Sequence, residues 1–249
     1  MAKLKNSMFR GQFSLQVLVN REVQREGRHE DLNYVVLPSE VDYELLVTTP
    51  PGEWLIVVAV DGLDITDGQR KPADKCGGYI MRNKNAALEP RESGNFVDGD
   101  KLRRIIRGYR IDNESVATFR TGKRKDSYAA VLGESPENVG VIGIAFFAGH
   151  CVEPPPVEES VQEVCRGGQS KGLECLGGNT RSIGTSFGSR AEDKVRTVQF
   201  VRSGPVGVLE LFYDREEVLE ARGIAFPPPS PEDRFQFRRG CPIPSGWQG

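Results

Sequence analysis

The sequence has little of what most catalytic and metal sites are built from. Histidine occurs only twice in the 249 residues, as His29 and His150. The five cysteines are widely spread and form no Cys-x-x-Cys pair, the usual spacing of a zinc knuckle. From these residue types we predict no catalytic residue, no metal site and no cofactor.

Charge and hydropathy argue against two further classes of protein. The chain has 33 basic and 35 acidic residues, so it lacks the basic excess typical of nucleic-acid-binding proteins. The longest nearly uninterrupted apolar run, residues 139–149, is about half the length of a membrane-spanning helix. We therefore expect no membrane insertion and no nucleic-acid partner.

The first residues lack the apolar stretch of a signal peptide. This favours a chain made in the cytoplasm, with its final location open, including within an assembled particle. The expected state of the cysteines is then a reduced thiol. A single disulfide within residues 151–175, formed after release from the cell, is the alternative.

Phosphate-binding fingerprints are also missing. No Gly-x-Gly-x-x-Gly follows the apolar run that ends at Val60. Residues 120–127, RTGKRKDS, fail the Walker pattern because Arg124 follows Gly-Lys and Ala117 stands where its first glycine belongs. The arginines of residues 101–110 and this basic loop are predicted to be solvated charges. One shared positive face is the weaker alternative.

Glycine and proline are abundant, with 28 and 16 residues, which indicates many turns. The most conspicuous turn candidate is AVDGLDITDG, residues 59–68, where Asp61, Asp64 and Asp67 stand at every third position. Asp-Gly is a strong turn pair, because glycine accepts positive φ and aspartate bonds the nearby backbone. A calcium loop needs oxygen ligands at alternate positions and a bidentate glutamate, so the turn is favoured over a metal site.

Short strands dominate the predicted secondary structure. Alternating apolar and polar residues predict half-buried strands, and two apolar runs predict strands covered on both faces, at 54–60 and 139–149. Residues 194–202 and 207–214 are predicted to form a hairpin around the linker Ser-Gly-Pro. The other predicted strands are at 13–20, 33–38, 42–50, 77–82, 102–111 and 115–122.

The remaining segments are predicted to be loops and short helices. Residues 83–100 have the composition of a long polar loop, and residues 157–164 that of a short helix. Asp126 or Ser127 is expected to cap one or two helical turns. The clearest helix is at 214–223, with Asp214 as its cap and Gly223 as its end.

These elements together predict an all-β protein, a β-sandwich or jelly-roll-like fold with one short helix near 214–223 and long Gly/Pro loops. Residues 1–151 would form the sandwich core, followed by a polar surface excursion at 152–182. Residues 183–225 would complete the same domain. Residues 226–249 would form a Pro-rich tail carrying Phe226, Phe235, Phe237 and Trp247.

A series of sequence blocks resembles a family of uncharacterised, mainly bacterial β-rich proteins. The resemblance covers residues 13–225 and leaves the tail outside. The family has no assigned activity, so the resemblance implies only that the glycine-turn blocks are scaffold. The blocks, in chain order, are VVAVDGLDITDG, GGYIM, VATFR, DSYAA, NVGVIGIAFF, IGTSFG, VRTVQFVR and LELFYDREEVLEARGI.

The functional hypothesis that follows is a non-enzymatic structural or interaction protein. It would be a self-associating subunit of a particle, filament or appendage, in contact with itself or another protein through the aromatic tail. A ligand- or glycan-binding β-sandwich module is the alternative. A carboxylate-dependent hydrolase is the third hypothesis, because the chain holds many aspartates and glutamates.

Overall fold

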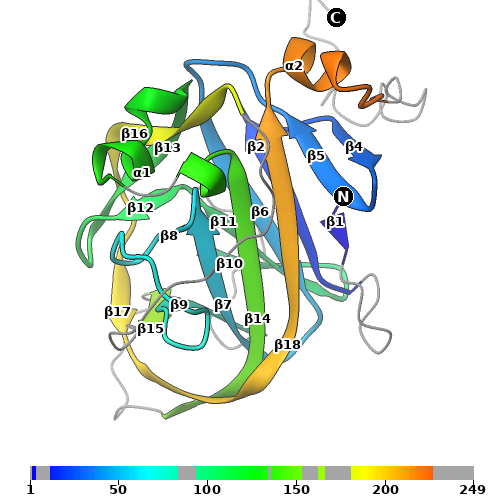
Figure 1. The fold of residues 1–249 in the computed structure, drawn as a ribbon. Coiled ribbons are helices and arrows are strands. Elements are labelled where there is room, and N and C mark those ends of the chain that lie inside the picture. Colours follow the sequence, from blue (N-terminus) through cyan, green and yellow to red (C-terminus); the bar gives the residue numbers. More distant parts are fainter. Residues whose placement is uncertain are drawn as a thin grey trace, which may run out of the picture.

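Two nine-stranded sheets pack face to face (Figure 1). This all-β architecture confirms the predicted sandwich class. The computed structural model describes residues 2–3, 12–83, 94–133, 136–152, 162–165 and 181–226.

The first sheet runs in the order β1, β2, β6, β11, β10, with β3 paired to β2. It branches where β6 also meets β13, which pairs with β12 and β16. The strands are β1 (Ala2–Lys3), β2 (Ser14–Val19), β3 (Glu22–Val23), β6 (Asp42–Thr49), β10 (Gly94–Asp98), β11 (Lys101–Ile106), β12 (Gly108–Arg110), β13 (Ser115–Lys123) and β16 (Ile183–Glu192).

The second sheet runs in the order β17, β15, β9, β7, β14, β18, β5, β4, with β8 attached to β7. Two of its pairs, β15 with β17 and β18 with β5, are parallel, and the others are antiparallel. The strands are β4 (Glu26–His29), β5 (Leu32–Val36), β7 (Glu53–Val60), β8 (Leu63–Asp64), β9 (Gly78–Arg82), β14 (Val141–Val152), β15 (Gln162–Cys165), β17 (Val195–Thr197) and β18 (Gln199–Asp214).

The main core lies between the sheets and draws on residues from Phe13 to Tyr213. Strand β7 shows how the alternation works: Ile56 and Val58 face this core, whereas Leu55 and Val57 face a second apolar cluster on the other side. Both predicted central strands, β7 and β14, are thus buried on two faces, as their continuous apolar runs indicated.

The predicted hairpin between 194–202 and 207–214 is wrong. Residues 199–214 form one long strand, β18, which pairs with β14 from Gln199 to Phe212. Gly204, with φ +117°, and Pro205 lie between two shifts of register, so they bulge the strand without reversing it.

Two other segments also differ from the prediction. Within the predicted loop 83–100, residues 94–98 form β10, which pairs with β11 and buries Phe96. Within the predicted helix 157–164, residues 162–164 belong to β15, so the second half of that helix is wrong. The rest of the predicted excursion, 153–161 and 166–180, lies outside the described residues.

The other two predicted helical segments are present. Helix α1 (Tyr128–Val131) is capped by Ser127, whose hydroxyl accepts from the Ala130 amide. Helix α2 (Glu216–Ala221) ends before Gly223, which has φ +77°. Its cap is Arg215 rather than Asp214, because the Asp214 carboxylate accepts from the Ser182 and Arg215 amides.

Candidate functional site

The Asp61-Gly62 pair is a turn, as predicted, and it joins β7 to β8. Asp61 has φ +54° and Gly62 φ +83°, the left-handed conformations that a tight hairpin turn needs. A Cβ at residue 62 would lie 2.8 Å from the Asn138 Cβ, so glycine is also needed for space.

What the sequence did not indicate is that the Asp61 carboxylate is buried, with 1% of the residue exposed. Its oxygens accept three hydrogen bonds of 2.7 Å, from the Gly140 amide, the Thr185 amide and the Tyr213 hydroxyl. These donors come from the approach to β14, from β16 and from β18. One side chain therefore ties together segments that are far apart in the chain.

A chain of hydroxyls extends from this carboxylate to the opposite sheet. Tyr213 lies 2.6 Å from the Thr185 hydroxyl, which lies 2.7 Å from the Tyr43 hydroxyl in β6. Burial raises the pKa of Asp61 to about 6, although its hydrogen bonds oppose the shift. Burial, and then the nearby Asp61 charge, also raise the pKa of both tyrosines.

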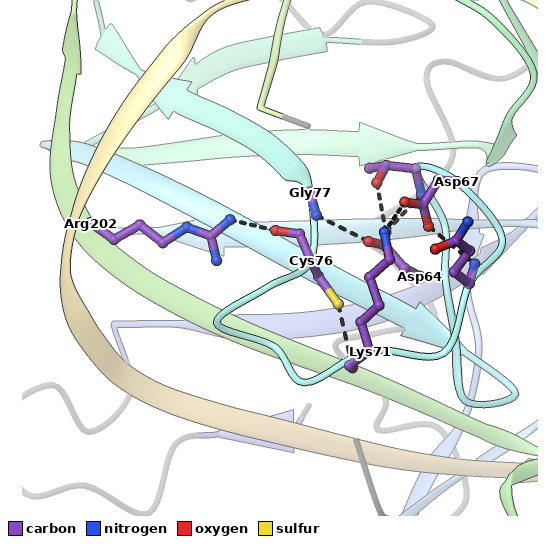
Figure 2. Close-up of polar contacts among 8 residues, drawn as sticks. Asp64, Asp67, Lys71, Cys76, Gly77 and Arg202 are labelled. Atoms are coloured by element: carbon purple, nitrogen blue, oxygen red, sulfur yellow. Dashed lines mark hydrogen bonds and ion pairs between the residues drawn. The ribbon is translucent and has the colours of Figure 1, made fainter. Parts of the chain in front are cut away.

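The second carboxylate of the turn, Asp64, organises the loop that follows (Figure 2). One of its oxygens accepts from the amide and hydroxyl of Thr66, each at 2.8 Å, and the other accepts from the Gly77 amide at 3.0 Å. The bonds to Thr66 form an Asx turn, and the bond to Gly77 fixes the loop to the start of β9. Burial raises the pKa of Asp64.

Lys71, Asp67 and Cys76 complete this loop. Lys71 is 4% exposed, and its ammonium group forms an ion pair with Asp67. The Cys76 thiol lies 3.5 Å from the Lys71 carbonyl oxygen, and burial raises its pKa well above the usual range, so it stays protonated. Arg202 of β18 donates to the carbonyls of Ala73 and Cys76, as Figure 2 shows for Cys76.

The arginines of residues 101–110 differ in burial and in their partners. Arg104 is buried with its guanidinium carbon 4.1 Å from the Tyr79 ring centre, and Arg110 forms a buried ion pair with Asp193. The others contact separate acidic partners: Arg103 with Asp98, Arg107 with Glu44 and Arg120 with Asp42. The prediction that these arginines are solvated charges is therefore wrong for Arg104 and Arg110.

The two histidines occupy unrelated positions. His29 lies 3.8 Å from Glu30 in the β4–β5 hairpin, and His150 lies on β14 opposite Val201. Cys76 carries a free thiol, whereas Cys165, Cys175 and Cys241 lie outside the residues whose side chains are described. Across the described ranges, no three His, Cys, Asp or Glu side chains are placed to share a metal ion.

A different kind of candidate lies at the outer edge of β18. On one side β18 pairs with β14, and on the other it pairs with β5 only from Phe212 to Asp214. On that outer side, no described strand is hydrogen-bonded to residues 207–211, although β1 lies close to β18. We call residues 207–211 the open edge.

The backbone direction of the open edge follows from alternation along the strand. The Tyr213 amide donates toward Gly140 on the β14 side, and Asp214 accepts from Leu37 on the β5 side. Backbone groups alternate in direction from one strand residue to the next, so every second residue points to the same side. The amides of Val208 and Glu210 therefore point outward, as the backbone of Asp214 does. The pairing with β14 has no register shift between residues 207 and 212 that would change this parity.

A groove of about 330 Å³ lies where β5 and β18 diverge beside the open edge. Two of its apolar side chains are well exposed, Leu32 at 38% and Val208 at 51%. Glu210 makes no ion pair with any described residue, whereas Asp31 contacts Arg28. The groove is lined by Asp31, Leu32 and Asn33 before and within β5 and by Val208, Glu210 and Phe212 of β18.

The comparisons with known proteins identify no relative. No protein-family model, no curated protein and no solved structure matches the chain. The resemblance to a bacterial family therefore stays a prediction. In the part of the chain that the structure describes, no helix has both the length and the apolar character needed to cross a membrane.

Proposed function

We propose that this protein is a non-enzymatic structural subunit that associates with copies of itself through the open edge of β18. The observation that carries the proposal is a strand edge with outward amides at Val208 and Glu210, beside a groove with exposed Leu32 and Val208. Such an edge is a ready template for a strand from another chain. Repeated addition would build a particle, filament or appendage.

The polar groups that first suggest chemistry support this assignment. Asp61 and Asp64 each accept at least three hydrogen bonds from their own chain, so their carboxylates stabilise the fold. Among the described residues, the outward amides of the open edge have no such partners, and burying the exposed part of Val208 or Leu32 contributes about 1 kcal/mol. Pairing of these amides and burial of these side chains would therefore favour association at the open edge.

The proposal is tested by the mass of the full-length protein in solution. Size-exclusion chromatography with light scattering should give multiples of 27.5 kDa that grow with protein concentration, and electron microscopy should show regular assemblies. Val208→Lys should shift the protein to monomer, because an edge lysine opposes strand addition. A 27.5 kDa monomer at every concentration would refute the proposal.

Val131→Lys is the matched control. Val131 is 73% exposed on α1, so the same change of residue is made at a site away from the open edge. It should leave the assembly state unchanged. If both variants dissociate the protein equally, the effect comes from added charge and the edge is not the contact.

The groove favours a second candidate, a ligand-binding module. Its volume of about 330 Å³ is that of a small ligand site, and it places Asn33 and Glu210 beside the Phe212 ring. A glycan array and thermal-shift measurements test this candidate. A ligand that raises the melting temperature of the native chain and not of Asn33→Ala would support it, and an array with no binding would remove it.

A further inference from the structure

The described chain ends beside the groove. Phe226, its last described residue, packs against the cluster that contains Tyr34 and Phe212. It also lies over Gly27, where an added Cβ would come 2.9 Å from the phenyl ring. Gly27 pairs with Tyr34, the neighbour of the groove residue Asn33. Figure 1 shows α2, which precedes this end, close to β4 and β5.

The sequence that follows Phe226 has two parts. Residues 227–231, PPPSP, favour an extended polyproline conformation, which is a stiff spacer. Residues 234–239, RFQFRR, alternate in the pattern of a strand, with Phe235 and Phe237 on one face. We call residues 234–239 the RFQFRR segment.

The RFQFRR segment is complementary to the groove in shape and charge. Added to the open edge as a strand, its main chain would meet the outward amides of Val208 and Glu210. Its two phenylalanines would reach the apolar side chains Leu32, Val208 and Phe212. Its three arginines would meet a groove whose Glu210 has no ion pair among the described residues.

The stiff spacer favours a groove on another molecule over the groove of the same chain. Five residues of polyproline conformation span about 15 Å. Phe226 already lies next to the hairpin that lines its own groove, because Gly27 and Tyr34 are paired there. A spacer of this length carries the RFQFRR segment beyond that groove and toward a neighbouring subunit.

We infer that the groove between β5 and β18 receives the RFQFRR segment of a second copy of this chain, which adds to the open edge as a strand. This inference rests on the proposed function and names the segment that performs the association. Each subunit would then offer one groove and one tail, a head-to-tail arrangement that forms rings or filaments.

The test compares full-length variants by light scattering. Phe235→Ala/Phe237→Ala should weaken self-association at least tenfold, because both ring contacts are lost. Trp247→Ala is the matched control, since it removes an aromatic residue from the same tail outside the RFQFRR segment, and it should assemble as the native chain does. Phe235, Phe237 and Trp247 all lie outside the described residues. An unchanged melting temperature in each variant would show that the folded domain is intact.

A charge exchange makes the pairing specific. Glu210→Arg should weaken self-association about tenfold, as should Arg234→Glu/Arg238→Glu/Arg239→Glu. An equimolar mixture of the two variants should assemble again, because the groove of the first then matches the tail of the second. Recovery in the mixture supports a contact in trans, and its absence overturns the inference.

The outcomes separate this inference from the proposed function. If the native chain assembles and Phe235→Ala/Phe237→Ala assembles equally well, the RFQFRR segment is not the occupant, although self-association stands. If the native chain is a monomer at every concentration, both proposals fail. A peptide of residues 230–241 that binds a monomeric native chain would not rescue either one, because it would show only that the groove accepts the tail.

Discussion

The Asp61 turn and the open edge of β18 belong to the same sheet but use their polar groups in opposite ways. The Asp61 carboxylate, in a residue that is 1% exposed, is directed inward and accepts hydrogen bonds from the chain itself. At the open edge, the amides of Val208 and Glu210 point outward and the Val208 side chain is 51% exposed. Asp61 thus links the two sheets, whereas the segment VGVLE is the contact surface in our proposal.

Removing the carboxylate at the centre of the first region should have the largest effect on stability. Asp61→Ala leaves the Gly140 and Thr185 amides buried without this acceptor, and the Tyr213 hydroxyl keeps only the Thr185 hydroxyl as a side-chain partner. We expect the free energy of unfolding to fall by about 4 kcal/mol, since each stranded group costs about 1–3 kcal/mol. Urea denaturation followed by circular dichroism measures this loss.

Asp74→Ala is the control for that experiment. Asp74 lies in the loop between β8 and β9 with a side chain that is 63% exposed, so its loss should change the free energy of unfolding by no more than about 0.5 kcal/mol. Equal effects of the two substitutions would show that the Asp61 network does not stabilise the fold.

The buried ion pair between Arg110 and Asp193 should come next. Asp193→Ala leaves the Arg110 guanidinium buried with the Tyr79 hydroxyl, 2.6 Å away, as its remaining side-chain partner of those described here. We expect a loss of about 3 kcal/mol in the free energy of unfolding. Asp98→Ala breaks the more exposed pair with Arg103 and should cost less than about 1 kcal/mol. A smaller loss for Asp193→Ala than for Asp98→Ala would contradict the importance of the buried pair.

The titration of Asp61 should appear in the pH dependence of stability. The folded protein binds this proton more tightly than the unfolded chain, because the pKa rises from 3.8 to about 6. The resulting stabilisation is complete below pH 3.8 and is lost as pH rises through about 6, a decrease of about 3 kcal/mol.

Comparison with Asp61→Asn isolates this contribution, because the amide does not titrate. The difference in free energy of unfolding between the native chain and the variant should change by about 2 kcal/mol between pH 4 and pH 7, with the native chain losing stability. Chemical denaturation at several pH values measures it. A constant difference would show that the pKa of Asp61 is not raised in the folded protein.

The smallest effect on stability is expected at the open edge. Val208→Lys should change the free energy of unfolding of the monomer by no more than about 0.5 kcal/mol, because the residue is exposed. The same substitution should abolish assembly. A large loss of stability in the monomer would show that Val208 supports the fold rather than a contact between subunits.

The fold was predictable where local patterns decide it. The continuous apolar runs of β7 and β14, the Asp-Gly turn and the glycine that ends α2 were all readable from neighbouring residues. Strand β18 was misread because Gly204 and Pro205 resemble a turn, whereas pairing with β14 along the whole strand overrides that local preference.

The candidate sites were harder to predict, because distant residues build them. Thr185 and Tyr43, which share a hydrogen bond in the Asp61 network, are separated by 142 positions. The open edge depends on where β5 ends beside β18, which no local pattern reveals. One signal was present in the sequence. Asp61 directly follows the apolar run 54–60, and a carboxylate that is buried beside such a run needs internal hydrogen-bond donors.

Hydrogen exchange of individual amides tests the contrast between the two regions most directly. We expect the Gly140 and Thr185 amides, which donate to Asp61, to be strongly protected at low and high protein concentration alike. The Val208 and Glu210 amides should exchange rapidly in dilute solution and become protected as the concentration rises and subunits associate. Exchange of Val208 and Glu210 at the same rate at all concentrations would contradict self-association through the open edge.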